Sequence, residues 1–168
     1  MPVPVLRIDF PLEASEDNIV AHLQAMVALY ALPVPTITAL GKTNDDDIIR
    51  ALKKGPTFYV VFENDYAPQQ TELAGDTFQN GWRVWRVLVL CSSMRGGPSP
   101  ARRGTEGAYY LSDAVKQFLT GYDPVSDTTA PAANYPMLYL GRHNAPSEDL
   151  TDYLMLLRFA HPIEVSPE

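Results

Sequence analysis

The sequence contains almost no cysteine and no long hydrophobic run, and both absences narrow what the chain can be. Cys91 is the only cysteine among 168 residues, so a disulfide framework and a cysteine-based zinc site are excluded. A single thiol at the end of an apolar strand is typical of a small buried hydrophobe. No apolar stretch is long enough to cross a bilayer, and the first residues lack the basic segment and apolar core of a signal peptide. We therefore expect no membrane contact.

Catalytic and cofactor motifs are also lacking. The three histidines, His22, His143 and His161, are far apart in the sequence, and no two have metal-ligand spacing. The aspartates after Asn44 are followed by neither the glycine nor the glutamate of a calcium loop. The glycines within 92–104 match no Walker or dinucleotide-binding pattern. We expect no catalytic residue, no cofactor and no metal, and therefore a protein that is not an enzyme.

Positive charge is in deficit. The chain has 13 lysines and arginines against 20 aspartates and glutamates, which gives a formal net charge of −7 and a sequence pI near 4.9. Such a balance argues against a protein that grips nucleic acid through its phosphates. It is compatible with an acidic surface that DNA slides past, because like charge repels DNA without holding it.

The central feature that the sequence does contain is an apolar stretch from Gly55 to Phe62. Aromatic and β-branched residues fill both of its alternating faces, a pattern typical of a strand in the middle of a covered sheet. The stretch carries no reactive group. Function must therefore come from loops, rims and subunit contacts.

Periodicity predicts the other elements around this strand. The chain is predicted to begin with an extended arm over 1–14, then a helix capped by Ser15 and ending before Pro33, a connection over 31–44 and a short helix over 45–54. Two strands follow over 57–62 and 82–91, joined by a polar loop over 63–80. A helix from about Thr105 to Gly121, strands over 136–140 and 150–161, and a polar tail over 162–168 complete the chain. This order predicts an α+β fold: one domain over 15–161, with a mostly antiparallel four-stranded sheet and two main helices packed on one face. The arm either adds an edge strand, lies on a neighbouring subunit or packs on its own domain.

Five segments in this order carry a resemblance to a known family. The first is the short helix that leads through Gly55 and Pro56 into the central strand, and the second is the strand that begins at Trp82. An Arg-Gly loop follows, then the segment 107–115 that opens the second helix, and finally a closing strand with Tyr153 and Phe159. Together they resemble the small tail-terminator and tail-completion proteins of tailed bacteriophages, in particular the Mu-like Gp37 group of contractile-tailed phages. The resemblance covers about residues 16–160 and rests on apolar and turn residues, not on a catalytic signature.

The resemblance implies a structural role in the virion. Such proteins form a ring, expected here to be a homohexamer, on the head-proximal end of the tail tube. The ring ends tube polymerisation and joins the tail to the neck. Its partners would be other copies of itself, the tail tube protein, and neck or connector proteins, with the sheath as a further candidate. DNA would pass through the lumen, past an acidic wall, without specific binding. The virion would be assembled in the cytoplasm of a bacterial host.

A ring built head to tail needs two different contact patches on each subunit. We place them on the loops over 63–80 and 92–104, because aromatic and arginine residues near these loops are common anchors at interfaces. The candidate interface residues are Asp65, Tyr66, Trp82, Trp85, Arg86, Arg95, Arg102 and Arg103. The alternative for each is a rim residue that packs within its own subunit.

Three other functions stay open. A head–tail connector or neck protein with a related fold is a second hypothesis, which the sequence hardly separates from the first. A non-viral α+β module that binds a ligand or peptide at its sheet edge is a hypothesis from another class. An enzyme would need His143 or His161 to meet carboxylates in a cleft.

Overall fold

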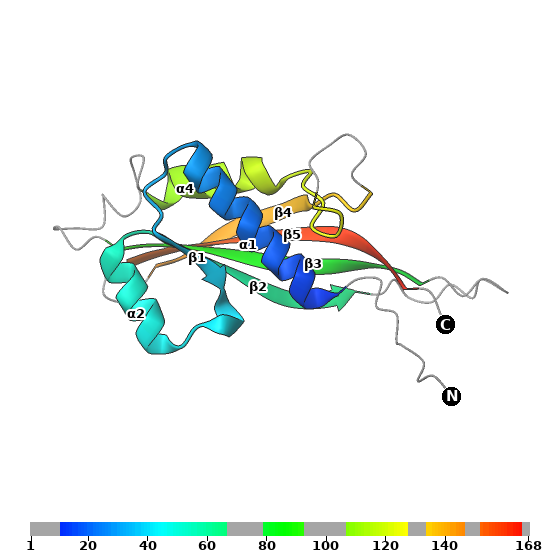
Figure 1. The fold of residues 1–168 in the computed structure, drawn as a ribbon, viewed down its shortest axis with the longest axis horizontal. Helices are drawn as coiled ribbons and strands as arrows, with labels where there is room; N and C mark the ends of the chain where they lie inside the picture. Colours follow the sequence, from blue (N-terminus) through cyan, green and yellow to red (C-terminus); the bar gives the residue numbers. More distant parts are fainter. Residues whose placement is uncertain (1–10, 67–78, 93–106, 128–133, 147–151, 166–168) are drawn as a thin grey trace, which may run out of the picture.

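Five strands form one sheet in the order β1-β2-β3-β5-β4 (Figure 1). The structure is a computed structural model that describes residues 11–66, 79–92, 107–127, 134–146 and 152–165. The strands are β1 (Thr36–Ala39), β2 (Thr57–Tyr66), β3 (Gln79–Ser92), β4 (Leu138–Pro146) and β5 (Asp152–Val165). β1 runs parallel to β2, and every other neighbouring pair is antiparallel. The sheet is therefore mixed.

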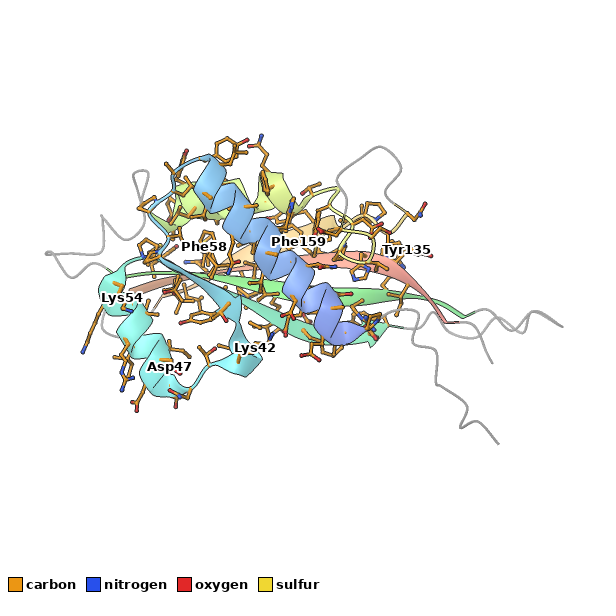
Figure 2. The ribbon with its side chains drawn as sticks, viewed as in Figure 1. Lys42, Asp47, Lys54, Phe58, Tyr135 and Phe159 are labelled. Atoms are coloured by element: carbon orange, nitrogen blue, oxygen red, sulfur yellow. The ribbon has the colours of Figure 1, made fainter. Side chains whose placement is uncertain are left out.

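Two helices, α1 (Leu12–Leu29) and α4 (Ala108–Leu119), cover one face of the sheet (Figure 1). β3 turns alternate side chains toward them because successive residues of a strand point to opposite faces. The core that results includes Ile19 and Leu23 from α1, Leu111 and Val115 from α4, Trp85, Val87 and Val89 from β3, and the labelled Phe58 and Phe159 of Figure 2. No helix within the described ranges has the length and apolar character needed to span a membrane.

The third α-helix, α2 (Asp45–Lys54), stands apart from this pair (Figure 1). Tyr59 of β2 points to the face opposite the core residues Phe58 and Val60, yet it is fully buried. Asp47 of α2 acts electrostatically on Tyr59, and α2 also contacts β3. We infer that α2 covers part of this second face. A short 3-10 helix, η1 (Leu40–Lys42), connects β1 to α2.

The predictions for the α+β class and for the short helix are confirmed. α2 spans Asp45–Lys54, as expected, with acidic residues in its first turn and Lys53 and Lys54 in its last. The Asn44 side chain accepts a hydrogen bond of 2.9 Å from the backbone N of Asp47 and so caps the helix. These are local signals, which is why the sequence sufficed.

The prediction of a four-stranded antiparallel sheet is wrong. β1 lies within the segment predicted as a connection, and it pairs in parallel with β2, Thr36 opposite Thr57. A four-residue strand beside prolines gives no periodicity to detect. Its partner comes from a part of the chain beyond α2, so only the tertiary structure supplies its hydrogen bonds.

The predicted element ends also need correction. α1 begins at Leu12, so the predicted arm is too long, and Ser15 lies inside the helix with its Oγ donating to the Pro11 carbonyl at 3.2 Å. α4 begins at Ala108, and Gly121 after it has a positive φ of +85°. The rest of the predicted arm lies outside the described residues.

The strands are longer than predicted because cross-strand hydrogen bonds continue into segments of polar residues. β2 continues to Tyr66, into the predicted loop, and β3 starts at Gln79. β4 continues to Pro146, and β5 continues to Val165, into the predicted polar tail. Residues 67–78 of the predicted loop lie outside the described residues.

A buried carboxylate holds the connection between α4 and β4. Asp123 is fully buried. One of its oxygens accepts from the backbone N of Val125 and Ser126 at 2.9 and 3.0 Å, and the other accepts from Asn134 and Tyr135 at 3.0 and 3.1 Å. Burial by itself raises the pKa of the carboxyl, but the hydrogen bonds, that of Ser126 first, outweigh it and hold the pKa below its ordinary value of 3.8.

Replacing this carboxylate should destabilise the fold. We expect Asp123→Ala to lower the free energy of unfolding at pH 7 by about 3 kcal/mol, because four backbone N–H donors lose their buried acceptor. Asp17→Ala is the control: its carboxylate is 51% exposed and pairs with Lys42 alone among the described residues, so the change should stay below about 1 kcal/mol. Urea unfolding measures both. Equal losses in the two variants would contradict the role given to Asp123.

The same residue should make stability depend on acid. Its pKa is lowered in the folded state, so its contribution is complete above the unfolded value near 3.8 and is lost as the pH falls through the lowered folded value. The stabilities of the wild type and Asp123→Ala should therefore converge in acid. Two curves that stay parallel from pH 7 down to pH 2 would show that the pKa is not lowered.

Candidate assembly surfaces

Two of the predicted interface residues come together where β2 ends and β3 begins. Tyr66 pairs with Trp82 across the two strands. Their exposed fractions are 49% and 42%, large for aromatic residues. We call Tyr66 and Trp82 the hairpin-end surface. Exposed aromatic residues of this kind are common anchors of protein interfaces.

Gly81 allows the strands to approach closely at this surface. A Cβ atom at this position would lie 2.6 Å from the Tyr66 carbonyl oxygen, a backbone atom. No side chain fits there without a shift of the backbone. Gly81 therefore helps to determine where Tyr66 and the neighbouring Trp82 are placed.

Asp65 makes its main contact within its own subunit. Its two oxygens accept from Nε and Nη2 of Arg83 at 2.9 and 3.0 Å. The Arg83 side chain is only 9% exposed, and that of Asp65 is 39% exposed. This two-point ion pair stabilises the strand pair, so Asp65 is better explained as an internal partner of Arg83 than as the contact predicted from sequence.

Arg86 belongs to a cluster that the sequence did not reveal. Glu63 accepts from Nε of Arg86 at 2.7 Å and from Nε and Nη2 of Arg158 at 2.9 and 2.8 Å. Arg86 and Arg158 are direct partners across β3 and β5. Hydrogen bonds, that of Arg86 first, lower the pKa of Glu63 to about 2. We call these three residues the Glu63 cluster; two guanidinium groups share one carboxylate, so positive charge is in excess.

Trp85 must be removed from the list of interface candidates. It is fully buried in the core and meets Phe62 edge to face, with ring centroids 5.7 Å apart. Its side chain points to the same face of β3 as those of Val87 and Val89, which face the helices. The remaining candidates, Arg95, Arg102 and Arg103, lie outside the described residues.

A second exposed apolar surface lies where α1 ends beside α4. Leu29, Tyr30 and Tyr110 are 70%, 61% and 47% exposed, and we call them the helix-pair surface. Tyr30 continues the apolar spacing of α1, yet it is exposed because it is the residue that ends the helix.

A small cavity opens on the helix-pair surface. Its volume is about 170 Å³, and it is lined by Met26, Tyr30, Leu32, Tyr110, Ala114, Gln117 and Phe118. Small-molecule sites usually measure about 300–1,000 Å³. The cavity is therefore closer in size to a single side chain of a protein partner than to a ligand.

The two surfaces lie at opposite ends of the molecule (Figure 1). Near the start of α4, Tyr109 packs edge to face on Tyr153, with centroids 5.7 Å apart. Tyr153 pairs with Cys91, at the far end of β3 from Trp82. At a rise of about 3.3 Å per residue, these two ends of β3 are about 30 Å apart. Partners bound at the two surfaces would therefore not compete for space.

The residues considered for chemistry are buried or isolated. His161 is fully buried, and burial lowers its pKa to about 4, whereas His143 is exposed on β4. Cys91 is buried, as predicted, and burial raises its pKa to about 12. Within the part of the chain that the structure describes, no three His, Cys, Asp or Glu residues are arranged to hold a metal ion.

The comparisons with known proteins find similarity in fold, among solved structures. A scan against family models finds no match, and a search of curated proteins finds none either. Among solved structures, the chain is similar to one from "Virion of native gene transfer agent (GTA) particle". The TM-score is 0.52 at 15% identity, over 89% of this chain and 94% of that chain. At this identity the match establishes a shared fold.

The first prediction from these surfaces concerns Gly81. We expect Gly81→Ala to lower the free energy of unfolding by about 1–3 kcal/mol, because the new methyl group meets a backbone oxygen. Gly41→Ala is the matched control, since a Cβ there has nothing within 4 Å. Thermal unfolding compares the two. If the two variants unfold at the same temperature, the close approach at Gly81 has no energetic consequence.

The second prediction concerns the Glu63 cluster. Glu63→Gln leaves Arg86 and Arg158 facing each other without a carboxylate, so stability at pH 7 should fall by about 2 kcal/mol. The wild type should also lose stability as the pH falls from the ordinary value of 4.5 toward the folded value of about 2. That part of the acid dependence should be missing in the variant.

Asp113→Asn is the control for Glu63→Gln. Its carboxylate also pairs with an arginine, Arg142, but is 61% exposed, so the loss should stay below about 1 kcal/mol. Denaturant unfolding from pH 7 to pH 2 measures both variants. An unchanged acid profile in Glu63→Gln would show that this carboxylate is not held in its ionised form by the arginines.

Proposed function

We propose that this chain is a structural protein of a phage-like virion and, more specifically, a tail terminator. The observation that carries the proposal is the similarity of fold to a chain of a gene transfer agent virion particle, over nearly the whole of both chains. In this role the protein would cap the head-proximal end of the tail tube as a homohexameric ring. Membership of the Mu-like group is the finer hypothesis, supported by the sequence segments that resemble that family.

The exposed surfaces support this role. A terminator contacts copies of itself and also tube and neck proteins, so it needs more than one binding surface, and a head-to-tail ring alone needs two. The hairpin-end surface and the helix-pair surface lie at opposite ends of the molecule and have different residues. Tyr30 and Trp82 stay 61% and 42% exposed despite the contacts that their surfaces make within the subunit.

The charge balance supports a channel that does not hold DNA. The chain carries a formal net charge of −7, and an acidic lumen would repel the phosphates of DNA during its passage. We propose no catalytic role, no cofactor and no specific nucleic-acid contact for the protein.

A head–tail connector is the nearest alternative. Both roles are compatible with the same fold and the same exposed surfaces, so the attachment site on the particle separates them. The terminator hypothesis expects the chain on purified tails that lack heads. Its presence on heads that lack tails, and its absence from free tails, would favour the connector.

Self-association provides the direct test of the ring. We expect light scattering across a concentration series to show a discrete hexamer, and electron microscopy to show closed rings with a central hole. Trp82→Ala should weaken self-association about tenfold or more, because an exposed aromatic anchor is lost. Leu140→Ala is the control, since Leu140 is 51% exposed but belongs to neither surface.

A monomer at every concentration, with no ring on isolated tails, would contradict the proposed function. An equal effect of Trp82→Ala and Leu140→Ala would leave the ring in place but would remove the hairpin-end surface from it.

A further inference from the structure

The Glu63 cluster has unused binding capacity on the face of the sheet away from α1 and α4. Arg86 and Arg158 alternate with residues that face those helices, and their side chains are 42% and 35% exposed. Arg86 contacts Glu63 through Nε. Its terminal nitrogens have no hydrogen-bond partner within the described ranges. Two guanidinium groups and one carboxylate leave a positive patch on a strongly acidic chain.

Apolar side chains lie directly beside this positive patch. Leu88 and Leu156 form the next cross-strand pair along β3 and β5, on the same face. Both are half-buried. In the other direction, the same face of β3 leads to Trp82. A partner that fits here must therefore present acidic groups to the arginines and an apolar group about two strand residues away.

The first turns of α2 have this composition. Exposed residues in these turns include Asp45, Asp46 and Ile49. Ile49 is a large apolar residue, yet it is 52% exposed. No ion pair involves Asp45 or Asp46 within the described part of the chain. In Figure 2 the start of α2, marked by Asp47, lies at the outer margin of the molecule. It can therefore meet another copy.

The spacing of the two surfaces also agrees. Along α2, Ile49 lies four residues after Asp45, which is a rise of about 6 Å on one side of the helix. Along β3, Leu88 lies two residues after Arg86, which is about 6.6 Å on one face of the strand. An aspartate over the arginine pair thus places the isoleucine over the leucine pair.

We infer that the Glu63 cluster is the ring contact for α2 of a neighbouring copy. Asp45 and Asp46 of one copy meet Arg86 and Arg158 of the next, and Ile49 packs against the adjacent leucine pair. This inference rests on the proposed ring. The two patches are different, so the contact is head to tail, as a closed ring requires.

Charge reversal tests the pairing. Arg86→Glu makes both patches of a copy acidic, and Asp46→Arg adds positive charge to the acidic patch. Each variant alone should self-associate about tenfold or more weakly than the wild type, since like charges then face each other. An equimolar mixture should regain assembly, because each kind of copy then meets an oppositely charged patch of the other. Light scattering measures assembly, and native mass spectrometry measures the composition of the mixed rings.

Two controls separate assembly from folding and from net charge. Lys116→Glu makes the same change in net charge as Arg86→Glu at an exposed position of α4, and it should assemble like the wild type. Among the described residues, Asp46 has no ion-pair partner to lose, so Asp46→Arg keeps the test valid if Arg86→Glu folds poorly. Thermal unfolding of each variant verifies the fold.

The outcomes distinguish this inference from the function on which it rests. Wild-type rings together with unimpaired assembly of Asp46→Arg would overturn the α2 contact and leave the ring intact. If both variants fold but assemble neither alone nor as a mixture, the α2 contact is also overturned and the ring is left intact. A wild type that forms no ring would overturn the proposed function and this inference together.

Discussion

Strand pairing on both sides of β3 is the constraint on which the rest of the structure depends. β5 pairs with β3 along its full length, and β2 pairs with it from Trp82 to Leu90. One face of β3 carries Trp85 into the core under the helices, while the other carries Arg86 to the surface. A shift of register by one residue would exchange these faces. The core and the candidate contact surface are therefore set by the same hydrogen bonds.

This register creates a local conflict that Glu63 resolves. It places Arg86 directly opposite Arg158, and like charges in that position destabilise a sheet. The register of β2 shifts between Phe62 and Asn64, which leaves Glu63 as the additional residue of a β-bulge. Its side chain can then bond both guanidinium groups. A cluster that is stable within the subunit and still in excess of positive charge is well suited to binding an acidic partner.

The shared fold supports the proposed function through the backbone arrangement, and the exposed surfaces support it through their side chains. The similarity to a virion chain at 15% identity concerns the backbone arrangement, and one fold can serve unrelated functions. Specific contacts depend on side chains such as Trp82 and Tyr30, whose large exposed fractions are unusual for aromatic residues. The shared fold and these exposed aromatic side chains together support the proposed ring subunit.

The sequence alone determined the features that rest on neighbouring residues. α2 could be predicted in full from its cap, its charges and the Gly-Pro that follows, and the apolar character of β2 and β3 was evident. Tertiary structure decided the rest. Both faces of β3 are rich in apolar residues, so only packing against α1 and α4 determines that Trp85 is buried and Arg86 exposed. The Glu63 cluster joins residues 95 positions apart, and such a contact follows from strand order, which no local pattern encodes.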